Sequence, residues 1–443
     1  MFLSQLRCQA GLHTWKYSPK VPFGSRSFFQ SNVQRYSLRA SRSLRDKPAT
    51  EPPRSFRDAL KRSRPVETFS EKVGRPGIRN QILFAGVGSL LVFCYAASRT
   101  NIETEYWKKR LMDMSSVWTF QSIKSTDLKR AQNADLIRYL REWFQSINSK
   151  LQDMPALIRP WVGLAFVSVL QPYADASEGK RLCWKICLLN AGVYLAWKIR
   201  KWRPAMNVRF MHNPLSGLSY TLLTSMFSHQ SFLHLLFNCL ALESFGSAAY
   251  YYLMREQEKS QPPMLESTGA FHFLAFFISA GLFSGLVSHV ASVKFLYPRM
   301  VAQLTAAGRA TSKPDTWAAA VAATTKTASS AAANTAAKEV PRILPSLGAS
   351  GAVWATLTMT ALAFPDSQVA LFIPPSYPIN IQTAVSGLVL FDMIGILRGW
   401  RMFDHWAHLG GAAFGVAYYA YGPDFWHRLR RTFAIDPASI PTS

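Results

Sequence analysis

The residue whose surroundings best suit nucleophilic chemistry is Ser350. It lies in Gly348-Ala349-Ser350-Gly351-Ala352, at the start of an apolar stretch. A serine at a helix start has free backbone N–H groups beside it, and with the helix dipole they stabilise an oxyanion. Alone the motif is weak, because small-residue packing of membrane helices also explains it. Ala352 stands where a nucleophile elbow needs glycine, which disfavours an α/β-hydrolase.

A candidate general base follows further along the chain, at His408. Gly411 and Gly415 lie on the same helical face and would let a facing helix approach closely. The imidazole could then take the proton of Ser350. Asp404, one turn earlier, could orient the ring, but a helix N-cap explains it better. We therefore predict a Ser350–His408 dyad rather than a triad.

A third polar group precedes both, at His229, His234 and Asn238. His234 and Asn238 are four residues apart and share one helical face. An imidazole and an amide directed at one point form an oxyanion hole, which is the role we predict for them with support from His229. A purely structural hydrogen-bond cluster is the alternative. Zinc is disfavoured because no acid is near and H-E-x-x-H is absent, so we expect no metal and no cofactor.

Three other polar residues in apolar stretches, His289, Asp392 and His405, are assigned structural roles. Polar groups at membrane depth are costly, so each is a candidate for function. An interhelical hydrogen bond is the more common explanation for His289 and Asp392. His405 faces away from His408 on the expected helix.

The elements that carry these residues are long apolar runs between basic ends and loops. Of 443 residues, 49% are hydrophobic and 17% charged, with a formal net charge of +25. Membrane contact and organelle import explain this charge better than nucleic-acid binding, so no nucleic-acid partner is expected. The pattern predicts an all-α membrane bundle with one N-terminal helix and a six-helix core. The candidate spans are 81–98, 182–198, 229–251, 269–293, 347–364, 380–397 and 404–421.

The N-terminal segment 1–45 contains no Asp or Glu and many Arg and Ser residues. This composition is typical of a mitochondrial transit peptide, with a basic cytosolic tail as the alternative. Within the following connector, residues 157–170 are apolar but too short to span, which predicts an interfacial helix. The remaining predicted divisions are a polar linker at 46–80, a soluble or interfacial connector at 99–180, a core at 181–421 with a low-complexity loop insertion at 294–342, and a tail at 422–443.

The three motifs, in this order, resemble the rhomboid family. Rhomboids carry H-x-x-x-x-H-x-x-x-N in an early span, then a G-x-S-G serine, then A-H-x-x-G-x-x-x-G. The resemblance covers about 180–421 and implies an intramembrane serine endopeptidase that acts in the lipid bilayer. It implies Ser350 as nucleophile, His408 as general base, and His234 with Asn238 at the oxyanion. The matching residues are Gly348 to Gly351, Ala407, His408, Gly411 and Gly415, with His229, His234 and Asn238 upstream.

The transit-like segment, the extra N-terminal helix and His405-x-x-His408 are similar to the mitochondrial, inner-membrane branch of that family. That branch implies membrane-anchored mitochondrial protein substrates; in fungi these are a dynamin-like fusion GTPase and cytochrome c peroxidase. Two features depart from the pattern: the Trp-Arg pair is not at its expected place, and the insertion is unusually long.

Two other functions stay open. One is an inactive rhomboid-like protein that only binds membrane helices, which the presence of Ser350 and His408 disfavours. The other is a transporter with histidines as a proton relay, which the lack of an internal repeat disfavours. Nothing in the sequence indicates an oligomeric state.

Overall fold

The structure is a computed structural model that describes residues 76–114, 123–152, 155–311, 343–370 and 375–434. The described chain is almost wholly helical, apart from a two-residue antiparallel pair between β1 (Gln368–Val369) and β2 (Ile379–Asn380). The predicted transit segment and most of the predicted polar linker lie outside the described residues.

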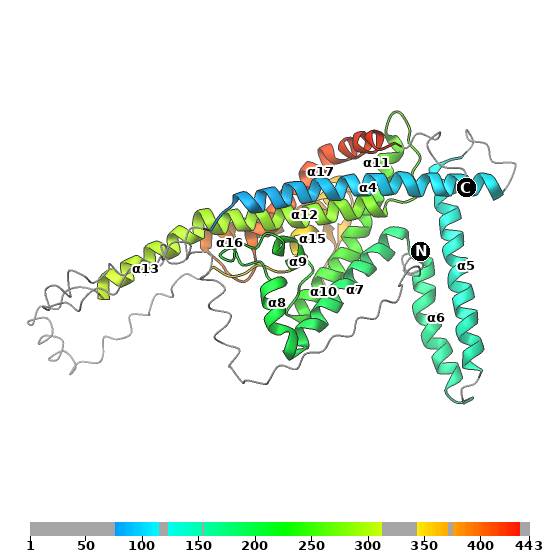
Figure 1. Ribbon diagram of the computed structural model, residues 1–443, viewed down its shortest axis with the longest axis horizontal. Coiled ribbons are helices and arrows are strands. Elements are labelled where there is room, and N and C mark those ends of the chain that lie inside the picture. The colour runs from blue at the N-terminus through cyan, green and yellow to red at the C-terminus, as the bar shows by residue number, and fades with distance from the viewer. Residues whose placement is uncertain (1–75, 115–122, 153–154, 312–342, 371–374, 435–443) are drawn as a thin grey trace, which may run out of the picture. The chain divides into compact units, whose positions relative to one another are not determined.

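Four helices form the centre of the bundle. Helix α4 (Arg79–Met114) lies along α12 (Ala270–Ala291), and α12 packs against α15 (Ser350–Ala363) and α17 (His405–Thr432) (Figure 1). Helix α12 is apolar around its whole circumference, which is the pattern of a helix buried on all sides. Most of α15 is buried as well, and its small side chains let α17 approach.

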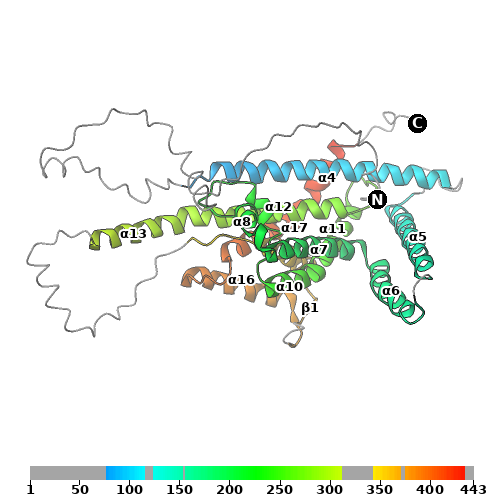
Figure 2. The ribbon, with the colours of Figure 1, turned by 60° about the horizontal axis from the view of Figure 1, so that its bottom comes forward.

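Some of the remaining helices pack around this centre and others project from it. Helices α5 and α6 pack against each other as a hairpin (Figure 2). In this hairpin the rings of Trp143 and Phe166 lie edge to face, with centroids 5.8 Å apart. Helix α6 covers much of the predicted interfacial stretch and buries none of its residues. The bounds are α5 (Ser125–Leu151), α6 (Arg159–Asp175), α7 (Glu178–Lys198), η1 (Arg200–Trp202), α8 (Arg203–Arg209), α9 (Thr221–Ser225), α10 (Phe232–Ala241), η2 (Leu242–Gly246), α11 (Ser247–Lys259), η3 (Ser292–Leu296), α13 (Tyr297–Thr311) and α16 (Ile381–Arg398).

Several helices have the length and composition of membrane spans. Among the described residues four qualify: Arg79–Met114, Phe232–Lys259, Ala270–Thr305 and Ile381–Arg398. A fifth is added if α7 and the following helical segment, bent by 92°, count as one. Helix α15 has only 14 residues and is covered by its neighbours rather than exposed along its length. The predicted class, a multi-pass helical membrane bundle, is confirmed.

Three predicted boundaries differ from the structure. Helix α4 continues to Met114 instead of ending near 98, because Thr104 and Trp107 are buried there. The predicted loop insertion at 294–342 begins as helix, since the chain stays helical from Ala270 to Thr311; an alanine-rich sequence favours helix. Helix α17 extends to Thr432 instead of ending near 421, because its last turns also have buried partners.

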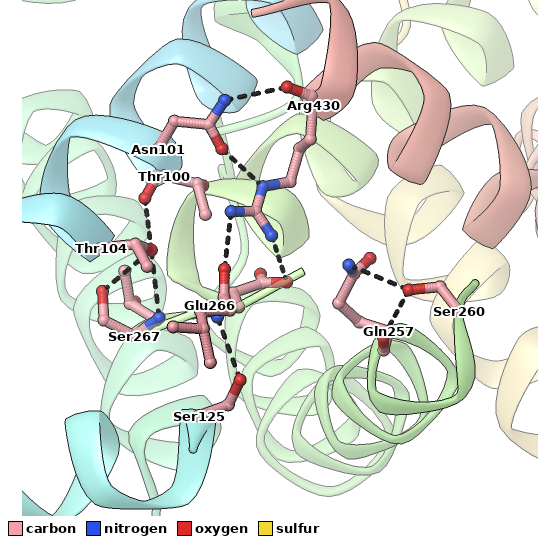
Figure 3. Close-up of polar contacts among 12 residues, drawn as sticks. Thr100, Asn101, Thr104, Ser125, Gln257, Ser260, Glu266, Ser267 and Arg430 are labelled. Carbon is pink, nitrogen blue, oxygen red and sulfur yellow. Dashed lines mark hydrogen bonds and ion pairs between the residues drawn. The ribbon is translucent and has the colours of Figure 1, made fainter. Parts of the chain in front are cut away.

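Those partners form a buried polar network at the C-terminal end of α17, which we name the polar clamp: Asn101, Glu266 and Arg430 (Figure 3). The Arg430 guanidinium donates to Asn101 Oδ1 at 2.9 Å, to Glu266 Oε2 at 3.2 Å and to the Leu265 carbonyl at 2.9 Å. Asn101 in turn donates to the Arg430 and Phe433 carbonyls. The clamp therefore fastens α4 and the loop between α11 and α12 to the end of α17.

The charges in the clamp are almost fully removed from solvent. The Arg430 and Glu266 side chains are 2% and 1% exposed. Burial raises the pKa of the Glu266 carboxyl, and the neighbouring Arg430 charge opposes that rise. A buried ion needs its counter-charge, because removing one partner leaves the other uncompensated.

Candidate active site

Ser350 and His408 face each other at the starts of two packed helices. Ser350 is the first residue of α15, and His408 lies in the first turn of α17. The distance from Ser350 Oγ to His408 Nε2 is 3.1 Å, which is within reach of direct proton transfer. The indole ring of Trp354 stacks on the imidazole, with ring centroids 5.3 Å apart. The structure thus brings together the two residues that the sequence singles out.

Glycines make this approach geometrically feasible. A Cβ on Gly411 would lie 2.0 Å from the carbonyl oxygen of Gly351, and one on Gly415 would lie 2.4 Å from the carbonyl oxygen of Ala355. A Cβ on Gly351 would meet the Ser284 hydroxyl at 2.0 Å. The backbones of α15 and α17 are therefore in contact, and any larger residue would push the serine and histidine apart.

The loop that precedes Ser350 is fixed by hydrogen bonds to other parts of the bundle. Gly348 has φ +122°, a conformation that favours glycine, and its N–H donates to the Ser225 carbonyl at 2.9 Å. Ser346 pairs with His212 through two backbone hydrogen bonds of 2.9 Å. The Ser346 hydroxyl also donates to Asp404 at 2.6 Å. These contacts hold the loop in one conformation and so fix where α15 begins.

The upstream histidines lie against this same loop. His229 Nε2 accepts the Ala349 N–H at 3.4 Å. The His234 ring covers Gly348, where an added Cβ would come within 2.6 Å of His234 Cε1. The two imidazoles form an edge-to-face pair with centroids 4.9 Å apart. Asn238 donates one N–H to the His234 carbonyl of its own helix at 2.8 Å. Because an amide has two N–H donors, the second stays available.

The structure adds a carboxylate that sequence analysis did not assign to the site. His408 Nδ1 lies 3.1 Å from Asp392 Oδ2 and 3.2 Å from Oδ1, so α16 supplies a third group to the pair. We expected Asp392 to form an interhelical hydrogen bond, and it does, but the partner is His408 itself. The arrangement is that of a Ser–His–Asp triad rather than the predicted dyad. The sequence did contain a feature that points to Asp392, because it is the lone charged residue between 381 and 397.

Two other predicted assignments can be checked against the structure. Asp404 is the N-cap of α17, accepting the Ala407 N–H at 3.1 Å, as expected. His405 was assigned away from the site, yet its Nδ1 donates to Asp392 as well. The ligand atoms of Asp392, His405 and His408 lie within 4.8 Å of one another, a grouping that could hold a metal ion. Each of these atoms already has a hydrogen-bond partner.

A small, partly open pocket lies beside Ser350. Its walls include Gly348, Ser350 and Gly351, together with Met226 and Gly281. Small residues dominate the lining, so the pocket suits a small side chain next to the Ser350 hydroxyl.

The fold is a multi-pass helical membrane bundle, and it brings a serine and a histidine together at the starts of two closely packed helices. Residues 217–423 match the family described as Rhomboid domain. These residues therefore carry a rhomboid domain, the family that the motifs resemble.

Relatives of this chain carry mitochondrial names. It is 27% identical over 329 residues to "Presenilin-associated rhomboid-like protein, mitochondrial" of Bos taurus, covering 71% of this chain and 67% of that one. The human protein of that name gives 27% over 330 residues with the same coverage. "Rhomboid protein 1, mitochondrial" of Saccharomyces cerevisiae is 26% identical over 240 residues, covering 54% of this chain and 52% of the yeast protein.

Proposed function

We propose that this protein is an intramembrane serine endopeptidase in which Ser350 is the nucleophile and His408 the general base. The observation that carries the proposal is the 3.1 Å approach of Ser350 Oγ to His408 Nε2. Asp392 supports it, because a carboxylate on Nδ1 keeps the proton there and leaves Nε2 free to act as base.

The reaction proceeds by acyl transfer. His408 Nε2 takes the Ser350 proton as Oγ attacks the substrate carbonyl, and it then gives that proton to the leaving amine. Water enters and is activated by the same imidazole, which releases the acyl group. Backbone N–H groups of the first turn of α15, the free N–H of Asn238 and the His234 ring stabilise the oxyanion, with His229 supporting the loop.

The substrates follow from the location of the site. The bundle is embedded in lipid, so the scissile bond belongs to a membrane-anchored protein, and the pocket beside Ser350 favours a small residue there. The names of the relatives and the acid-free N-terminus support placement in the mitochondrial inner membrane. A dynamin-like fusion GTPase and cytochrome c peroxidase are candidate substrates.

The test compares wild type with Ser350→Ala, purified in detergent and in liposomes, on a helical transmembrane substrate. The matched control is Ser279→Ala, which removes another buried serine hydroxyl, one without a hydrogen-bond partner in the described chain. We expect cleavage and fluorophosphonate labelling in wild type and in the control, and neither in Ser350→Ala. Cleavage that persists in Ser350→Ala would refute the proposal, as would an inactive wild type that binds the substrate without cutting it.

A further inference from the structure

Two buried histidines outside the candidate active site connect three separate segments of the chain by hydrogen bonds. His212 Nδ1 lies 2.8 Å from Thr221 Oγ1, and His212 Nε2 lies 2.9 Å from His289 Nδ1. His289 Nε2 lies 3.0 Å from the Gly77 carbonyl oxygen, and it must be the donor because a carbonyl oxygen only accepts. The connection therefore runs from the loop after α8, through α12, to the residues just before α4.

The backbone of His212 supports the loop that precedes Ser350. Its N–H donates to the Ser346 carbonyl and its carbonyl accepts the Ser346 N–H, both at 2.9 Å. The Ser346 hydroxyl in turn donates to Asp404, the N-cap of the helix that carries His408. A displacement of His212 would therefore displace the loop that sets the distance between Ser350 and His408.

The contact with Gly77 brings in the N-terminal helix α4, which the rhomboid-domain match does not include. That match covers residues 217–423, so Gly77, α4 and His212 all lie outside it. Gly77 lies two residues before the start of α4, and α4 packs against α12, the helix that carries His289. The start of α4 is thus linked to the loop before Ser350 through two imidazoles.

We propose that His289 and His212 are positioning residues that connect the start of α4 to the loop before Ser350. The inference rests on the proposed function of Ser350. The ring nitrogens bond to Thr221, to Gly77 and to each other, so neither ring acts on the substrate directly. The connection holds its geometry because a buried donor or acceptor that loses its partner finds no water to replace it.

Variants of His289 separate the two ends of the connection. The amide of an asparagine takes the place of Nδ1, and the amide of a glutamine takes the place of Nε2. His289→Asn therefore keeps a partner for His212 and loses Gly77, whereas His289→Gln keeps Gly77 and loses His212. His289→Leu loses both. Thr221→Val keeps the shape of that side chain and removes the hydroxyl that holds His212 from the other side.

The first measurement is kcat and KM on a fluorogenic transmembrane substrate. We expect kcat of His289→Leu to fall about 10- to 100-fold with KM within about twofold of wild type, because a small misplacement of reacting groups lowers the rate of the chemical step. The other three variants should lose less. The matched control is His272→Gln, which changes another buried histidine of α12, one that bonds to Tyr418 instead. Wild-type kcat in His289→Leu or in His289→Asn, or an equal loss in His272→Gln, overturns the inference.

The second measurement, hydrogen–deuterium exchange, follows the loop without relying on catalysis. The Ser346 and Gly348 N–H groups donate to the His212 and Ser225 carbonyls. We expect both amides to exchange faster in His289→Leu than in wild type, and at the wild-type rate in His272→Gln. Unchanged exchange in His289→Leu beside an active wild type would refute the connection and leave the proposed function standing. Faster exchange beside a wild type that cleaves no substrate would support the connection and refute the proposed function.

Discussion

Helix α17 carries a polar cluster at each end, and the two differ in whether their hydrogen-bond donors are all used within the protein. The first turn holds His408, which joins Ser350 and Asp392. The last turns hold Arg430 of the polar clamp. The 22 residues between His408 and Arg430 correspond to roughly 33 Å of helix, about the thickness of a bilayer core.

The clamp uses its donors within the protein. Arg430 donates from three nitrogens to three different acceptors, and Glu266 and Asn101 are held in return. The end that carries His408 leaves capacity free, because Ser350 shares a single hydrogen bond with His408 and borders a partly open pocket. Similar polar groups thus serve stability where the donors are used within the protein, and under the proposed function they serve chemistry where a partner is left for the substrate.

The largest expected effect is a loss of activity, without a loss of stability, when His408 is changed. His408→Asn removes the base, and kcat should fall by about 10⁴ to 10⁶, as for loss of a catalytic histidine elsewhere. Thermal unfolding of the variant should stay close to wild type, because an Asn amide can still donate to Asp392 and His405 remains its other partner. Steady-state kinetics and melting curves on the same preparation check both. A variant that loses stability in proportion to activity would erase the distinction between the two ends.

The second-largest expected effect is a loss of stability, without a loss of activity, when the polar clamp is changed. Arg430→Met leaves Glu266 buried without its counter-charge, which should cost about 3 to 5 kcal/mol of unfolding free energy. Molecules that stay folded should keep the wild-type kcat. Unfolding in mixed detergent, with the double variant Arg430→Met, Glu266→Met as control, measures this. The double variant should recover much of the loss; no recovery would assign the effect to packing instead of charge.

A smaller effect distinguishes the oxyanion donors from the base. Asn238→Ala should lower kcat by about 10² to 10³ with little change in KM, since the lost hydrogen bond forms mainly in the transition state. Asn238→Asp keeps the size of the side chain but removes the donor and should be at least as slow. Turnover by Asn238→Ala at the wild-type rate would leave the amide a structural bond to the His234 carbonyl.

The smallest effect concerns a buried imidazole near the site that does no chemistry. Burial and the adjacent His289 lower the pKa of His212 to about 3, so the folded protein holds it neutral. The unfolded chain binds a proton near the ordinary value of about 6.5. Protonation of His212 therefore has no effect on the unfolding free energy above pH 6.5, and it lowers that free energy as the pH falls from 6.5 toward 3. Melting temperatures between pH 7.5 and 4.5 should fall less steeply in His212→Gln than in wild type.

Local sequence patterns predicted most of the helices and the meeting of Ser350 with His408. Apolar runs, the glycine spacing on α17 and the small residues around Ser350 are local, and each constrains packing directly. The clamp was not predictable in this way, because Asn101 and Arg430 are 329 residues apart and Glu266 and Arg430 are 164 apart. Asp392 was not assigned to the site because its contact depends on the register between α16 and α17, which is set by their crossing and by the close approach at Gly395.

The clamp also sets an order on biosynthesis. Asn101 and Glu266 leave the ribosome long before Arg430, which follows Glu266 by 164 residues. Until Arg430 arrives, the newly inserted chain carries an acidic group with no counter-charge at the end of its bundle. Completion of the last helix removes that defect in a single step, since one guanidinium closes all three contacts. A product that stops short of residue 430 therefore keeps the Glu266 carboxylate without the guanidinium that pairs with it in the complete chain.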